Sequence, residues 1–150
     1  MTSNNSKKTK GLKFTRHFTK EGIRPEDMFE YDLRTSVIKN PDGGIVFKMD
    51  NVEVPAFWSQ VATDILAQKY CRKAGVPMPD GTTGSETSIK QVAHRMAHCW
   101  RSWGEQYNYF ATKKDADIFY EELVYSIIGQ QAAPNSPQWF NSGLFSSYGI

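Results

Sequence analysis

The alternation of apolar and polar residues predicts a β-hairpin in the first third of the chain. Two apolar stretches, residues 37–38 and 45–47, flank the sequence NPDGG at 40–44. Its proline presets φ and its glycines can adopt positive φ, so this sequence is typical of a tight turn. A third short extended segment, residues 52–54, follows. We therefore expect residues 31–54 to form strands.

Three later segments repeat apolar residues with the 3.6-residue period of an amphipathic helix. The first follows Pro55 and ends before Gly75, the second runs from about Glu86 to about Tyr107, and the third begins at Thr112. The sequence TKKD at the third start matches a capping box. The apolar stripes are Phe57, Trp58, Val61, Ala62, Ile65, Leu66 and Tyr70; Ile89, Val92, Ala93, Met96, Ala97, Trp100 and Trp103; and Ala116, Phe119, Tyr120, Leu123, Val124, Ile127 and Ile128. These patterns predict a mainly α fold with a small β-hairpin, of the α+β class.

Composition is that of a globular protein, but the charge is unevenly placed. The 150 residues carry a net charge of only +2, yet residues 1–24 hold seven Lys and Arg against one Glu. We expect residues 1–24 to form a basic, partly flexible arm, because polar termini are rarely tied down. In the alternative interpretation, this arm binds a polyanion such as nucleic acid. Only two Phe residues lie among the charged residues, which is too few for a base-stacking surface. Nucleic acid is therefore not the favoured partner.

Two general features indicate a cytoplasmic protein. No stretch approaches the roughly 20 consecutive apolar residues of a membrane span, and the polar start lacks the apolar core of a secretory signal. The two cysteines, Cys71 and Cys99, form neither a CxxC motif nor a disulfide framework, which fits a reducing compartment.

Three features resemble sites of chemistry but favour simpler interpretations. His94 and His98 have a metal-binding spacing, but no carboxylate lies within three residues, so an exposed polar face is the favoured interpretation. Cys71 and Cys99 are expected to be small buried hydrophobes. The glycine-rich sequence GTTGS at 81–85 lacks the lysine of a phosphate-binding loop and is expected to be a solvated connector.

The segment at residues 132–143 has a more unusual composition. Ser136 lies between Pro134 and Pro137, which stiffen its backbone, and short polar residues alternate with Trp139 and Phe140. Rigid backbone with small hydroxyl and N–H groups suits an anionic oxygen ligand. The competing interpretation is a proline-bounded loop that only packs its two aromatic side chains.

Residues 135–143, NSPQWFNSG, resemble the segment that leads into the catalytic barrel of ribonucleotide reductases. Other stretches are similar to the N-terminal region of the adenosylcobalamin-dependent, class II branch, and they occur in the same order. Together they cover roughly residues 11–150, so the combination is specific although each motif alone is not. The further stretches are 11–20 (GLKFTRHFTK), 40–43 (NPDG), 52–60 (VEVPAFWSQ) continuing to 69–70 (KY), 103–104 (WG) and 109–112 (YFAT).

This resemblance implies an enzyme far longer than 150 residues, built around a ten-stranded α/β barrel. In the family, adenosylcobalamin generates a thiyl radical on a barrel cysteine, and the radical removes the ribose 3′ hydrogen. A cysteine pair then supplies two electrons, and the 2′ hydroxyl leaves as water. The implied partners are a ribonucleoside diphosphate, with a triphosphate left open, the remainder of the reductase in the same chain or a split partner, and a thioredoxin-type reductant.

The resemblance transfers few of these functions to this sequence. It places Ser136 against the substrate phosphates, with Asn135 as a weaker candidate, and implies no catalytic residue and no metal ligand here. Cys71 and Cys99 match none of the redox positions, and the cobalamin contacts are expected beyond Ile150. Residues 25–150 would form the N-terminal domain up to the first approach to the barrel. The tryptophan-rich stripes are then expected to pack against that barrel.

Two functional hypotheses follow. In the first, the chain is the N-terminal part of an adenosylcobalamin-dependent ribonucleoside-diphosphate reductase and is inactive alone. In the second, it is a stand-alone helical interaction module whose basic arm binds nucleic acid or a reductase partner.

Overall fold

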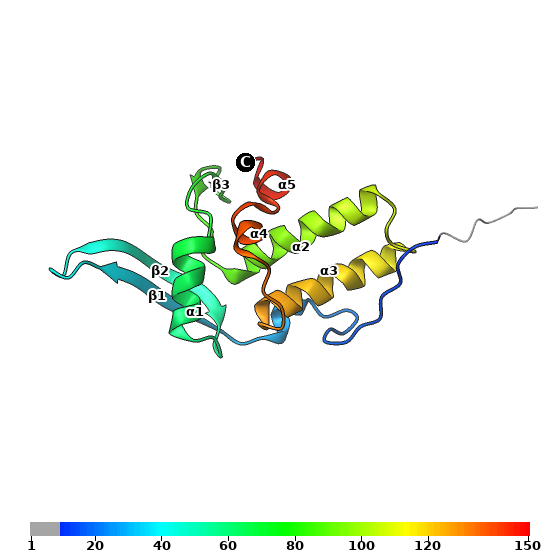
Figure 1. Cartoon of the computed structure of the whole chain (residues 1–150), viewed down its shortest axis with the longest axis horizontal. Coiled ribbons are helices and arrows are strands. Elements are labelled where there is room, and N and C mark those ends of the chain that lie inside the picture. The colour runs from blue at the N-terminus through cyan, green and yellow to red at the C-terminus, as the bar shows by residue number, and fades with distance from the viewer. Residues whose placement is uncertain (1–9) are drawn as a thin grey trace, which may run out of the picture.

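Two long helices lying side by side form the body of the molecule, and a β-hairpin projects from one end (Figure 1). The computed structural model describes residues 10–150. The predicted mainly helical α+β fold is confirmed, while the barrel stays a prediction. The elements are η1 (Pro25–Met28), β1 (Tyr31–Lys39), β2 (Ile45–Pro55), α1 (Gln60–Ile65), η2 (Leu66–Tyr70), β3 (Val76–Pro77), β4 (Thr83–Gly84), α2 (Ile89–Gln106), α3 (Lys113–Ile128), α4 (Ser136–Asn141) and α5 (Leu144–Tyr148).

The predicted hairpin is present, with β1 antiparallel to β2. The turn closes where the NPDGG sequence placed it: the amide of Asn40 donates to the Gly44 carbonyl at 2.7 Å, and Gly43 has a φ of +88°. Residues 52–54 are extended, as predicted, but they do not form a separate segment, because Val52 and Val54 belong to the inner end of β2. Both valines are fully buried in the core, so burial of this inner end anchors the projecting hairpin.

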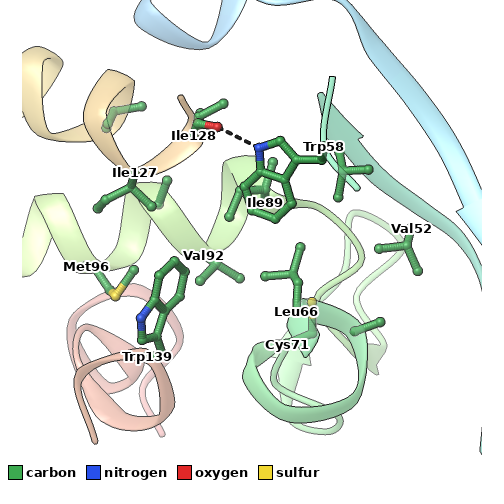
Figure 2. Packing of buried hydrophobic residues seen from close by; sticks show 14 of the residues in the cluster. Val52, Trp58, Leu66, Cys71, Ile89, Val92, Met96, Ile127, Ile128 and Trp139 are labelled. Carbon is green, nitrogen blue, oxygen red and sulfur yellow. Dashed lines mark hydrogen bonds between the residues drawn. The ribbon is translucent and has the colours of Figure 1, made fainter. Parts of the chain in front are cut away.

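The helix expected directly after Pro55 begins later and changes its pitch. Ser59 caps α1 by accepting a hydrogen bond from the Ala62 amide at 3.1 Å, and the chain then continues as a π-helical turn, η2. Trp58 precedes the helix and turns into the core, where its indole N–H donates to the Ile128 carbonyl at 2.9 Å (Figure 2). Because Trp58 is anchored before the helix begins, the predicted apolar stripe does not match the buried face of α1. Val61, a member of that stripe, lies on the exposed side of α1.

Every residue of the two predicted helix stripes is buried or half-buried except Trp103, which is exposed. Five apolar residues of α2 are completely buried, and both helices begin at side-chain caps. The hydroxyl of Thr112 accepts from the Asp115 amide at 3.2 Å, as the capping sequence predicted. An unpredicted capping box formed by Ser88 and Gln91 begins α2. The buried stripe of α2 is Ile89, Val92, Ala93, Met96 and Ala97.

The described part of the basic N-terminal segment lies along α3 (Figure 1). Residues 1–9 of the expected arm lie outside the described residues. The carboxylate of Glu122 accepts hydrogen bonds from the backbone amides of residues 17–19, at 3.0–3.1 Å. Arg16 forms an ion pair with Glu121, and the Phe14 amide donates to Asp115 at 2.9 Å. Carboxylates on α3 therefore hold this segment.

The tryptophans contribute mainly to the domain's own core, which corrects the expectation that they face the barrel. Trp58 and Trp139 are buried, and Trp100 is half-buried against the core. Figure 2 shows Trp139 pointing from α4 toward Met96 of α2. Of the four, Trp103 alone is largely exposed, at 52%. The exposed tryptophan surface is thus much smaller than the sequence suggested.

Candidate functional site

The proline-bounded segment forms a short helix, α4, with Ser136 at its first turn. Asn135 is the N-cap residue and has extended backbone, as expected for a residue just before a helix. Pro137 suits the first turn, where its missing N–H leaves no hydrogen bond unmade. The indole N–H of Trp139 donates back to the Pro134 carbonyl at 2.7 Å and so closes the segment on itself. Asn135 and Ser136 are both exposed.

The hydroxyl of Ser136 lies 3.1 Å from the hydroxyl of Tyr70, the last residue of η2. The Tyr70 ring stacks on the indole of Trp139, with centroids 5.0 Å apart and planes 14° from parallel. The Asn135 side chain caps no backbone N–H of α4. The structure therefore brings Ser136 together with Tyr70, a residue that the sequence did not single out for function.

A buried arginine on α2 holds this arrangement in place. The Arg95 side chain is completely buried and forms an ion pair with Glu86, also completely buried, at 2.7 Å. Its two terminal nitrogens donate to three backbone carbonyls: Ser142 at 2.9 Å, Trp139 at 2.7 Å and Tyr70 at 3.2 Å. One guanidinium therefore binds α4, η2 and the carboxylate of Glu86 at once.

Arg95 adjoins His94, for which the sequence predicts an exposed polar face, and a buried position was not expected for it. A signal was present: position 95 lies three residues after Val92 and four before Cys99, and both of these residues are buried. Fully buried arginine requires a partner that satisfies its charge and its donors. The partners come from residues 70, 86 and 139–142, and the periodicity of α2 carries no information about them.

Glu86 has further partners that complete the buried network. The Arg72 amide donates to its carboxylate at 2.8 Å, and so does the Tyr148 hydroxyl of α5, also at 2.8 Å. Burial, and then the charge of Glu86, raise the pKa of the Tyr148 hydroxyl, so this tyrosine stays a neutral donor. The network thus links α2 to α5 and to α4, the helix that carries Ser136.

The cysteines are small buried hydrophobes, as predicted. Cys71 and Cys99 are 3% and 5% exposed, and neither is in a disulfide. Burial, followed by the nearby charge of Glu86, raises the pKa of the Cys71 thiol to about 12. A thiol with such a pKa is protonated at neutral pH and is a poor nucleophile.

The two histidines of α2 lie close together without forming a metal site. Their ring centroids are 5.3 Å apart, and Nδ1 of His94 lies 2.7 Å from the Tyr120 hydroxyl. Burial, and then the neighbouring His98, lower the pKa of His94. Across residues 10–150, no group of three or more His, Cys, Asp or Glu side chains is placed to hold a metal ion.

The apolar hollow on one side of α4 is too small for a cobalamin. The apolar hollow between η2, α3 and α4 has a volume of about 230 Å³ and is lined by Trp58, Leu66, Tyr70, Ile127 and Trp139, among others. Pockets for ordinary small ligands have volumes of roughly 300–1,000 Å³, and a corrin macrocycle is larger than most such ligands. We therefore place no cofactor in this hollow. Within residues 10–150 no helix has both the length and the apolar character needed to cross a bilayer.

Comparison with known proteins identifies the family. The family model described as class II vitamin B12-dependent ribonucleotide reductase matches residues 32–130. The chain belongs to this family. The vitamin B12-dependent ribonucleotide reductase of Bradyrhizobium diazoefficiens is 45% identical over 93% of the chain, and the protein of the same name from Streptomyces clavuligerus is 41% identical over 92%.

The chain spans 13% of the length of the Bradyrhizobium relative and 14% of the Streptomyces one. The resemblance found in the sequence motifs is thus confirmed at the level of the family. The matched residues 32–130 include the hairpin except Tyr31, and both long helices, but they end before α4 begins. The role of Ser136 and Asn135 is tested by none of these matches.

Proposed function

We propose that the chain is the N-terminal part of an adenosylcobalamin-dependent ribonucleoside-diphosphate reductase, in which it provides a scaffold and part of the substrate phosphate loop. Within this chain Ser136 is the phosphate contact, Asn135 is a weaker second candidate, and no residue is catalytic. Adenosylcobalamin, bound elsewhere in the complete enzyme, supplies the radical. Residues 25–150 would act as one domain, and residues 1–24 as its basic arm.

The observation that carries this proposal is the fixed, exposed position of Ser136 in a chain of this family. Its hydroxyl is at the surface, while the backbone around it is held by a buried guanidinium and two prolines. A hydroxyl held in one place by rigid backbone binds a charged oxygen at a lower entropic cost than a hydroxyl on a mobile loop. The charge-assisted hydrogen bond to a phosphate oxygen is also stronger than one between neutral groups.

The partners follow from the same proposal. We infer that the remainder of the reductase, in the same chain or as a split partner, completes the site, and that a thioredoxin-type protein reduces it. The buried, unpaired state of Cys71 and Cys99 supports a reducing compartment, the cytoplasm, and gives neither thiol a part in that electron transfer. The basic segment offers less free charge than its composition implies, because Arg16 pairs with Glu121 and Arg24 with Glu26. A nucleic-acid ligand is correspondingly less favoured.

The test is a Ser136→Ala substitution in the complete reductase that contains this chain. Loss of one hydrogen bond to a charged group costs roughly 1.5–3 kcal/mol. The cost is about 1–2 kcal/mol where a water molecule partly replaces the lost hydroxyl. We therefore expect KM for a ribonucleoside diphosphate to rise roughly 5- to 30-fold, since 1.4 kcal/mol corresponds to a factor of ten. Steady-state kinetics with CDP and, in parallel, CTP would measure the effect and distinguish the two substrate classes.

Ser136→Thr is the matched control, because it retains a hydroxyl at the same backbone position. It should keep KM near that of the unmodified enzyme. Unchanged kinetics in the alanine variant, with both nucleotides, would remove Ser136 from the substrate site.

A further inference from the structure

We propose that Tyr70 is a positioning residue, whose hydroxyl orients the Ser136 hydroxyl toward the substrate phosphate. The inference rests on the proposed function of Ser136 and adds a second residue to that site. Tyr70 and Ser136 are 66 positions apart in the sequence, and the fold alone brings them together.

The first support is the geometry of the pair. The two hydroxyl oxygens are 3.1 Å apart, within hydrogen-bond distance. The phenol ring has two aromatic neighbours: it stacks on Trp139 at 5.0 Å and packs against Phe140 at 5.4 Å between centroids. A ring held in this way has little freedom to turn its hydroxyl elsewhere. Tyr70 is therefore a rigid support for Ser136.

The second support is the local backbone. Tyr70 ends the π-helical turn η2, in which the Cys71 amide donates to the Leu66 carbonyl at 2.9 Å. Single π-turns within helices are rare and are often found at functional sites. The end of such a turn leaves carbonyl groups without helical partners, and the carbonyl of Tyr70 is one that Arg95 binds.

The third support is that one nitrogen atom binds the backbone of Tyr70 and the backbone of α4, the helix that carries Ser136. Nη2 of Arg95 donates to the Tyr70 carbonyl at 3.2 Å and to the Trp139 carbonyl at 2.7 Å. Trp139 lies three residues after Ser136 in α4. The buried guanidinium thus sets the separation between the backbone that carries the phenol and the backbone that carries the serine.

The direction of the hydrogen bond gives the arrangement its chemical meaning. Either hydroxyl can donate in the ligand-free pair. A serine hydroxyl has a single proton, and a phosphate oxygen without a proton only accepts. When Ser136 donates to phosphate, Tyr70 must therefore be the donor to Ser136. The phenol then directs the serine proton outward and strengthens its hydrogen bond, since linked hydrogen bonds polarise one another.

Tyr70→Phe in the complete reductase removes this hydroxyl and keeps the ring that stacks on Trp139. We expect KM for CDP to rise roughly 3- to 10-fold, the scale of one neutral hydrogen bond, while kcat changes less than about two-fold. The melting temperature should stay unchanged, because the lost group is at the surface. Tyr109→Phe is the matched control: this tyrosine is exposed and lies beyond the far end of α2. It should leave KM and kcat unchanged.

The double variant Tyr70→Phe/Ser136→Ala separates this inference from the proposed function. If Tyr70 acts through Ser136, the double variant has the KM of Ser136→Ala alone. Wild-type KM in Tyr70→Phe, or an effect of Tyr70→Phe that multiplies that of Ser136→Ala, would overturn the positioning role while leaving Ser136 in the site. Unchanged kinetics in Ser136→Ala would instead overturn the proposed function, and the positioning role with it.

Discussion

A Gly143→Ala substitution tests whether the junction between α4 and α5 is as closely packed as the structure shows. Gly143 precedes α5 with a φ of +83°, in the left-handed region that side chains disfavour. A Cβ atom built there would lie 2.0 Å from the Arg95 carbonyl oxygen and 2.5 Å from the carbonyl carbon. Both atoms belong to the backbone of α2, which has no rotamer through which to move away. An alanine at position 143 therefore requires either the backbone between α4 and α5 or the backbone of α2 to move.

The magnitude has two parts that a matched variant separates. Gly81 has the same φ of +83°, but a Cβ there would have nothing within 4 Å. Gly81→Ala therefore reports the backbone strain alone, about 1–2 kcal/mol. Gly143→Ala adds the steric clash, and inserting atoms into well-packed structure costs a further ~1–3 kcal/mol. We expect Gly143→Ala to be the more destabilising variant by that difference.

Urea unfolding followed by circular dichroism would measure both variants against the unmodified chain. Hydrogen exchange would show whether the clash is relieved locally, by loss of amide protection in α4 and α5, rather than by a lower global stability. If Gly143→Ala matched Gly81→Ala in unfolding free energy and kept its amide protection, the close approach of residue 143 to α2 would be refuted.

Two further predictions concern titratable groups. Burial raises the pKa of Glu122, but hydrogen bonds from the Thr19 hydroxyl and the amides of residues 17–19 outweigh it and leave this pKa below its ordinary value. A carboxylate with a lowered folded-state pKa stabilises the fold above the unfolded pKa of about 4.3, and the contribution is lost as pH falls through the folded value. Glu122→Gln should therefore lose less unfolding free energy between pH 7 and pH 3 than the unmodified chain, and an equal loss in urea titrations would contradict this. A thiol reagent at pH 8 should label neither Cys71 nor Cys99 until urea unfolds the chain, because both are buried and the pKa of Cys71 is raised to about 12; rapid labelling of the native protein would contradict this.

Local rules were sufficient for the parts of the fold that depend on neighbours in sequence. The hairpin turn at 40–44 follows from proline and glycine preferences, and the stripe of α2 follows from the helical period. The cap at Thr112 also involves only residues three apart. In each case the groups that determine the structure are within a few positions of one another, so the sequence displays them directly.

Local rules failed where a distant partner determines the outcome. Trp58 leaves the expected helix because its indole bonds to the Ile128 carbonyl, 70 positions away. Residues 12–19 were expected to be part of a partly flexible arm, but Glu122 offers acceptors that single-sequence reasoning cannot place beside them. Ser136 was singled out from composition and resemblance, yet its contact with Tyr70 spans 66 positions. The candidate site is therefore less predictable than the fold that supports it.

The buried pair of Arg95 and Glu86 is better explained as a device for position than as a source of stability. The cost of removing two charges from water offsets much of their attraction, so such pairs contribute little net stability and apolar residues can often replace them. Apolar residues could not reproduce the direction of the bonds, because a guanidinium presents five donors in one rigid plane. Here those donors reach the carbonyls that end η2 and α4, two short segments with few other ties to α2. Since Tyr70 and Ser136 face each other across that junction, the plane of one buried side chain sets the geometry of the proposed phosphate contact.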